Sequence, residues 1–126
     1  MIDTGDRTVE FHAFFAQTEE QHEYGLMNRS SLPQDYGMVF LFFDETTDGF
    51  WMKNTRIPLS IAFFDVDGKI LEILDMEPCP PKTEACPIYK PDVPYQGALE
   101  VNEGAFDRAG VAEGDTIHAV PGGEGM

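Results

Sequence analysis

Apolar segments in this chain are short, and this property restricts its secondary structure more than any other. The longest uninterrupted apolar run is Met38-Val39-Phe40-Leu41-Phe42-Phe43. A membrane-spanning helix needs about 20 consecutive apolar residues, so the sequence predicts no membrane insertion. A short run that is rich in aromatic and β-branched residues is typical of a strand buried on both faces. We therefore expect a fold dominated by short strands.

Further strands are expected where polar and apolar residues alternate, or where turn residues flank an apolar run. Asp67-Gly68 separates two such runs and predicts a tight hairpin turn between them. The strands expected from these patterns cover residues 9–15, 37–43, 50–52, 59–65, 69–76, 98–101 and 116–120.

Two short helices are also expected. Thr18-Glu19-Glu20-Gln21 has the form of a capping box and predicts a helix that ends near Asn28. Asn102 can cap a second helix that ends at Gly110. These elements predict one β-rich α+β domain over residues 1–126, with a core at about 8–120 and frayed termini. The expected architecture is a compact antiparallel sheet, barrel-like or sandwich-like, with two short helices.

The chain is strongly acidic, with 8 Lys and Arg residues against 23 Asp and Glu residues and a net charge of −15. A field of this sign repels phosphate backbones, so no nucleic-acid partner is expected. The first six residues are polar and acidic and lack the basic start and apolar middle of a signal peptide. The protein is therefore either cytoplasmic or one whose leader is absent from this sequence.

Several strings spread along the chain form one set: Glu23-Tyr24-Gly25-Leu26-Met27-Asn28-Arg29, Gly37-Met38-Val39-Phe40, Phe50-Trp51-Met52-Lys53-Asn54-Thr55, Ile57-Pro58-Leu59, Pro78-Cys79, Leu99-Glu100-Val101, Gly104 and Gly114-Asp115. Together these strings resemble the DUF192 family, also called UPF0127, over about residues 9–120. The family pattern has Asp after Pro-Leu, where this chain has Ser60, so that carboxylate is either absent or replaced by Asp65. The resemblance implies a compact β-rich fold and no particular reaction. Because many relatives are exported or membrane-anchored, it also implies an extracytoplasmic protein whose leader is absent here.

The motif segment (residues 50–55) concentrates groups that suit a small ligand. We expect Trp51 to form an apolar wall, Lys53 and Arg29 to contact an anion, and Asn54 and Thr55 to orient the ligand by hydrogen bonds. An anionic or sugar-like ligand fits this set. The alternative is structural, because Asn and Thr after a strand commonly hydrogen-bond their own turn.

Cys79 and Cys86 are close in sequence and are favoured as a disulfide, with free thiols as the alternative in a reducing compartment. Two cysteines are only half of a zinc ligand set, so no metal or other cofactor is expected. A minor alternative places Cu(I) among Met27, Met38 and Met52, although methionine is ordinary core filler.

Two other functions compete with ligand binding. The proline-rich loop at residues 78–94 suggests a protein-interaction or accessory domain, with Tyr89 and Tyr95 as anchors. An unrecognised enzyme is the third alternative. The sequence has no nucleophile elbow, phosphate-binding glycine loop or metalloprotease helix, so no catalytic residue is assigned.

Overall fold

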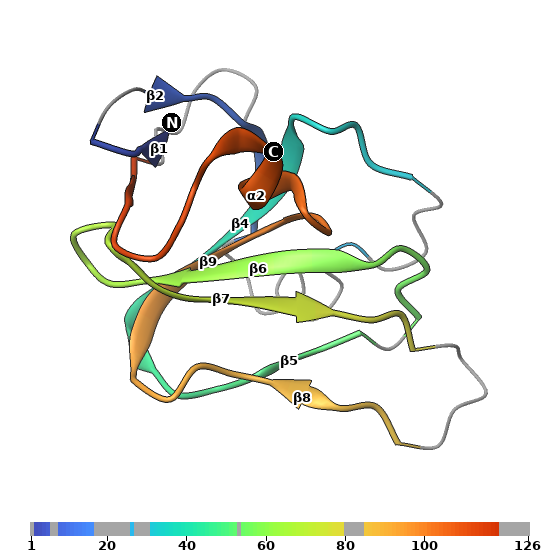
Figure 1. Ribbon diagram of the computed structural model, residues 1–126. Coiled ribbons are helices and arrows are strands. Elements are labelled where there is room, and N and C mark those ends of the chain that lie inside the picture. The colour runs from blue at the N-terminus through green and yellow to red at the C-terminus, as the bar shows by residue number, and fades with distance from the viewer. Residues whose placement is uncertain are drawn as a thin grey trace.

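A five-stranded sheet in the order β3-β4-β9-β6-β7 forms the middle layer of the fold (Figure 1). The computed structural model describes residues 2–5, 8–16, 26, 31–52, 54–79 and 85–118. Strand β3 runs parallel to β4, and the other neighbours in this sheet are antiparallel. The strands are β3 (His12–Ala16), β4 (Tyr36–Thr46), β9 (Tyr95–Asn102), β6 (Leu59–Phe64) and β7 (Ile70–Met76).

The predicted hairpin between β6 and β7 is confirmed. The Asp65 carboxylate accepts backbone N–H bonds from Asp67 and Lys69 at 2.9 and 3.0 Å, which fixes the turn locally. Gly68 has φ +86°, and a Cβ there would lie 2.1 Å from the carbonyl oxygen of Ile117. This turn therefore requires glycine both for its backbone conformation and for its close approach to β10 (Thr116–Ile117).

One face of the five-stranded sheet is covered by a small sheet in the order β10-β1-β2 and by helix α2 (Ala105–Ala109), as Figure 1 shows. Strand β1 is Ile2–Asp3 and β2 is Thr8–Val9. Ile2 is buried and pairs with both Val9 and Ile117, so the core begins before residue 8.

The opposite face is covered by a two-stranded ribbon of β5 (Phe50–Trp51) and β8 (Ile88–Tyr89), seen below the sheet in Figure 1. Their register pairs Phe50 with Tyr89 and Trp51 with Ile88. Phe50 and Tyr89 pack against the apolar cluster of this face. We call this apolar cluster the ribbon-side cluster. Its buried residues are Ala16, Leu26, Leu32, Met38, Phe40, Met52, Leu59, Ile61, Phe63, Met76, Cys79, Tyr95 and Ala98.

The prediction of a β-rich fold with few helices is confirmed, but three details differ. The main sheet is mixed, because β3 pairs with β4 in parallel. It is open, because β3 and β7 are its edges and do not pair with each other in the described residues. The part of the chain that is described contains one helix rather than two, and the helix expected from Thr18 to Asn28 lies outside it.

Helix α2 corresponds to the second predicted helix and ends at Gly110, which has φ +77°. Its N-cap is Gly104 and not Asn102, which belongs to β9. The Asn102 side-chain amide instead donates to the carbonyl oxygen of Leu32 at 2.6 Å, so it links the end of β9 to the segment that precedes β4. None of the described helical residues forms a helix long and apolar enough to cross a membrane.

Candidate functional site

The motif segment ends in a tight turn that backbone hydrogen bonds fix to Cys79, just after the end of β7. The Thr55 N–H donates to the Met52 carbonyl oxygen at 2.9 Å and closes the turn. The Asn54 N–H donates to the Cys79 carbonyl oxygen at 3.0 Å, and the Cys79 N–H donates to the Met52 carbonyl oxygen at 3.3 Å. Asn54 has φ +61°, a left-handed conformation that Asn and Gly tolerate best. Asn54 therefore has a backbone role whatever its side chain contacts.

The side chains of the motif segment lie in different environments. Trp51 is 47% exposed, whereas Met52 and Thr55 are 1% and 5% exposed. Asn54 is half-buried. The structure thus separates the predicted apolar wall at Trp51 from the predicted hydrogen-bonding group at Thr55. The predicted charged contacts, Arg29 and Lys53, lie outside the described residues.

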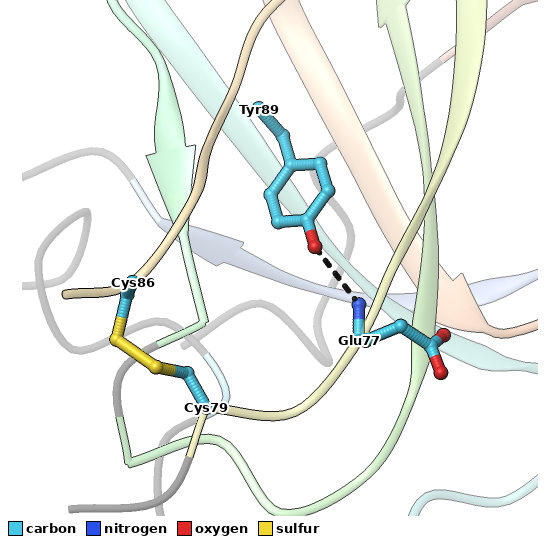
Figure 2. Close-up of a disulfide and its surroundings, with 4 residues drawn as sticks. All are labelled: Glu77, Cys79, Cys86 and Tyr89. Carbon is cyan, nitrogen blue, oxygen red and sulfur yellow. Dashed lines mark hydrogen bonds between the residues drawn. A yellow bond between two sulfur atoms is a disulfide. The ribbon is translucent and has the colours of Figure 1, made fainter. Parts of the chain in front are cut away.

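A disulfide joins Cys79 to Cys86, with their Cα atoms 5.9 Å apart (Figure 2). Figure 2 shows a second link between the same two segments, where the Tyr89 hydroxyl accepts the N–H of Glu77 at 3.3 Å. Because Cys79 also bonds the motif segment, the disulfide holds the end of β7, the start of β8 and the turn together. No cysteine in the described part of the chain is free.

The two tyrosines expected to anchor a protein partner are not exposed anchors. Tyr95 is fully buried, and its hydroxyl donates to the carbonyl oxygen of Asp48. Burial raises the pKa of this hydroxyl, and the nearby Asp48 raises it further. Tyr89 is half-buried and bonds Glu77. The prediction is wrong for Tyr95, because this residue begins the central strand β9 and its ring packs against Phe63 with the ring centroids 4.8 Å apart.

The sequence analysis missed Glu100, which lies near the middle of central strand β9. Its register partners are Met38 on β4 and Ile61 on β6. Both belong to the ribbon-side cluster, as do Met52 of the motif segment and Ala98, the residue two positions earlier on β9. The Glu100 side chain therefore points to the same face of the sheet as Met52.

Glu100 is only 5% exposed, and its burial raises the pKa of the carboxyl group to about 8. No hydrogen bond or ion pair to this carboxyl group is found within the described residues. A sequence signal existed: Glu100 is a single acid between Leu99 and Val101, inside a short apolar strand. A buried carboxyl group without a partner is unusual and marks a candidate functional position.

Ser60, which follows Pro58-Leu59, is buried in β6 and links two neighbouring segments by hydrogen bonds. Its hydroxyl donates to the Asp75 carboxylate at 2.7 Å and accepts the Gly104 N–H at 3.1 Å. Asp65 does not replace the missing carboxylate, because it lies past the far end of β6 and binds its own hairpin. Glu103, the residue before Gly104, forms a side-chain hydrogen bond with Glu77, and this bond raises the pKa of the Glu103 carboxyl group.

The acidic groups that the structure describes do not form a recognisable metal centre. Among the residues described, no group of three or more His, Cys, Asp and Glu side chains is arranged to hold a metal ion. The methionines considered for Cu(I) are divided: Met38 and Met52 lie in the apolar ribbon-side cluster, and Met27 lies outside the described residues.

Comparison with known proteins identifies the family of this chain and two similar structures. The model of the DUF192 family, described as an uncharacterized ACR, matches residues 1–119. A crystal structure of a candidate transcription regulator from Sinorhizobium meliloti 1021 is 36% identical, with a TM-score of 0.82 over 93% of this chain and 88% of that one. A protein of unknown function from Novosphingobium aromaticivorans DSM 12444 is 28% identical, with a TM-score of 0.84 over 94% and 81%. No curated protein matches the chain. The chain belongs to the DUF192 family.

Proposed function

We propose that this protein is a small ligand-binding module whose ligand contacts the motif segment. Trp51 supplies an apolar wall, Asn54 and Thr55 supply hydrogen bonds, and Arg29 and Lys53 supply charged contacts. Thr55 is buried, so its hydroxyl serves only a ligand that reaches beneath the turn. The exposed indole of Trp51 serves a ligand that arrives from solvent.

The observation that carries this proposal is the number of constraints on one short turn. The Asn54 N–H and the Met52 carbonyl oxygen both bond the backbone of Cys79, which the disulfide connects to Cys86. Asn54 also holds a left-handed conformation. Such over-determined backbone is common at ligand sites, because a fixed site loses little conformational entropy when it binds.

A thermal-shift screen of the wild type against sugars, sugar phosphates, carboxylates, amines and metals tests the proposal. A compound at about 100 times its Kd stabilises the native state by roughly 2.7 kcal/mol, which moves the Tm by several degrees. We expect Trp51→Ala and Lys53→Ala to abolish this shift while leaving the Tm of the free protein within a few degrees. A shift that survives both substitutions would place the ligand elsewhere.

Asn54 allows the two roles of the motif segment to be separated. Asn54→Gly keeps the left-handed turn but removes the side-chain amide, whereas Asn54→Ala removes the amide and strains the turn. If the amide contacts the ligand, both variants lose affinity although only Asn54→Ala loses stability. If Asn54→Gly binds as the wild type does, the side chain has only a structural role.

A second candidate function, a protein-interaction domain, has one observation in its favour. Trp51 and Ile88 are register partners on the ribbon, and their side chains are 47% and 60% exposed. Val93, which like Ile88 belongs to the proline-rich loop at residues 78–94, is 46% exposed. Large exposed apolar side chains that adjoin are typical of partner surfaces. The name of the Sinorhizobium meliloti relative fits a role through protein contacts, because the net charge of −15 disfavours direct contact with nucleic acid.

Ile88→Ser distinguishes the two functions. It should leave small-ligand shifts intact, because Ile88 is outside the proposed ligand contacts, and it should abolish capture of a protein partner. Loss of the small-ligand shift in Ile88→Ser would show that the ligand contacts extend from Trp51 to Ile88.

A further inference from the structure

Phe43 is almost fully exposed, although it belongs to strand β4 of the main sheet. Val39 and Leu41, the alternate residues before it, pack in the apolar cluster on the helix α2 side of the sheet. Regular alternation would place Phe43 on that face as well. Its side chain is instead 97% exposed. The end of β4 therefore presents this ring to solvent.

The pairing of β4 with β9 gives the reason. The register is regular up to Leu41 and resumes at Thr46. Between these two residues, the β4 bulge (residues 42–45) has only Gln96 of β9 opposite it. A strand with such an excess of residues bends outward, and bulges of this kind re-aim side chains.

The β4 bulge is fixed on both sides by side chains from the start of β9. The Gln96 side-chain amide donates to the Phe43 carbonyl oxygen at 3.2 Å. Beyond the bulge, the Tyr95 hydroxyl donates to the carbonyl oxygen of Asp48. The Asp48 N–H in turn donates to the Thr46 hydroxyl at 3.0 Å. A surface that is held in this way loses little conformational entropy when a partner binds.

Carboxylates without a counter-charge follow Phe43 along the chain. Asp44, Glu45 and Asp48 are exposed, and none of them forms an ion pair within the described residues. The sequence has no Lys or Arg between residues 30 and 52. The net charge of −15 adds a long-range field that attracts cations. The surface therefore combines an exposed aromatic ring with uncompensated negative charge.

One chemical group suits both features of this surface. A guanidinium group stacks on the face of an aromatic ring and donates charge-assisted hydrogen bonds to carboxylates. A second copy of this chain suits it poorly, because two proteins of charge −15 repel each other. The charge thus selects a basic partner.

We propose that the β4 bulge is a docking surface for a basic segment of a partner protein, with an arginine over the Phe43 ring. The guanidinium group of that arginine donates to the carboxylates of Asp44 and Glu45. None of these three residues is a proposed ligand contact of the motif segment. The inference is therefore independent of the proposed ligand-binding function.

An NMR titration of the ¹⁵N-labelled protein with the peptide acetyl-Leu-Arg-Leu-Arg-Leu-Arg-amide tests the proposal. Side chains alternate in an extended peptide, so its arginines share one face. We expect the peptide to shift the amide resonances of residues 43–48 and Gln96, and added salt to weaken it. The analogue with Lys should bind more weakly, because an ammonium group lacks the planar fork. The analogue with Glu should not bind.

Variants at exposed positions separate the ring from the charges. Phe43→Leu keeps an apolar side chain without a ring and should weaken the Arg peptide at least about fivefold, whereas Phe43→Tyr should bind it as the wild type does. Asp44→Asn/Glu45→Gln should weaken it at least about threefold. Two controls should bind as the wild type does: Asp107→Asn on helix α2 removes an exposed charge, and Ile88→Ser on the ribbon removes an exposed apolar side chain.

Three results would overturn the proposal. They are no resonance shift at residues 43–48 with the Arg peptide, equal affinity of the Arg and Glu peptides, and equal affinity of the wild type and Phe43→Leu. Sedimentation velocity provides a further test, because a dimer that Phe43→Leu abolishes would assign the surface to a second copy instead. The thermal shifts that depend on Trp51 are measured separately, so either proposal can fail without the other.

Discussion

Replacing Glu100 by glutamine should make the protein increasingly more stable than the wild type as the pH rises from 5 to 7. The pKa of the carboxyl group is 4.5 in an ordinary environment and about 8 when it is buried in the folded protein. Between these values the unfolded chain has lost the proton and the folded chain retains it. Stability from this group is therefore fully present below pH 4.5 and is lost as the pH rises to about 8.

The size of the effect follows from the same shift. Each pH unit between the two pKa values removes about 1.4 kcal/mol from the free energy of unfolding, so the loss between pH 5 and 7 is about 3 kcal/mol. Glutamine cannot titrate, so Glu100→Gln should escape this loss. The difference in unfolding free energy between variant and wild type should grow by that amount across the interval.

Urea is the suitable denaturant, because guanidinium would screen the charges of an acidic protein. Unfolding curves at pH 5, 6 and 7 for the wild type, Glu100→Gln and Glu45→Gln give the comparison. Glu45 is exposed, so its variant should follow the wild type at every pH. Parallel curves for the wild type and Glu100→Gln would refute the argument, because they would show that Glu100 ionises in the folded protein as it does in the unfolded chain.

Three further predictions concern the turns that position the site, and urea unfolding measures each. Asn54→Ala should cost about 1 kcal/mol and Asn54→Gly much less, because only alanine is strained at φ +61°; equal losses would contradict a backbone role. Gly68→Ala should cost at least about 2 kcal/mol, because its Cβ would lie 2.1 Å from the carbonyl oxygen of Ile117 at a φ of +86°; a neutral result would contradict this close approach. Reduction of the Cys79–Cys86 disulfide should cost about 2–3 kcal/mol, as expected for a loop with a sequence separation of 7; Cys79→Ser/Cys86→Ser should show the same loss and no response to reductant.

Local patterns predicted the elements whose conformation is decided by neighbouring residues. The β6–β7 hairpin was predictable because Asp65 and Gly68 fix its turn within the turn itself. The parallel pairing of β3 with β4 was not, because a parallel pair depends on a long crossover and leaves no mark in either strand. Strand β1 has two residues, too few for any periodicity, and the burial of Ile2 appears only when β1 pairs with β10, which lies within the strand predicted over residues 116–120.

Of the candidate site, the motif segment was predicted from the sequence and Glu100 was not. The motif segment stood out because a cation, an indole and polar groups are rare neighbours in this chain. Glu100 did not, because the surrounding apolar residues correctly predicted a buried strand and one acid does not change that prediction. Its importance depends on two facts of three-dimensional pairing: Met38 and Ile61 flank it, and no described side chain compensates it. Neither fact can be obtained from spacing along one strand.

The hydrogen bond made by the buried Ser60 leads to a last prediction. Ser60 is 2% exposed, and its hydroxyl donates to Asp75 at 2.7 Å. In Ser60→Asp a second carboxylate would replace that donor, so a buried aspartate would face the like charge of the exposed Asp75 carboxylate. Leaving a buried charge uncompensated costs about 3 kcal/mol or more at pH 7, and the cost should fall in acid as the carboxyl groups take up protons.

The double variant Ser60→Asp/Asp75→Asn tests the cause of this loss. The asparagine removes the like charge and can donate a hydrogen bond to the new aspartate, so most of the lost stability should return. Gly104 should be unaffected, because its N–H can donate to a carboxylate as it does to the Ser60 hydroxyl. Urea unfolding at pH 5 and 7 measures both effects. A loss that is the same at both pH values, and that Asp75→Asn does not rescue, would mean that Ser60 is required by its volume and not by its charge.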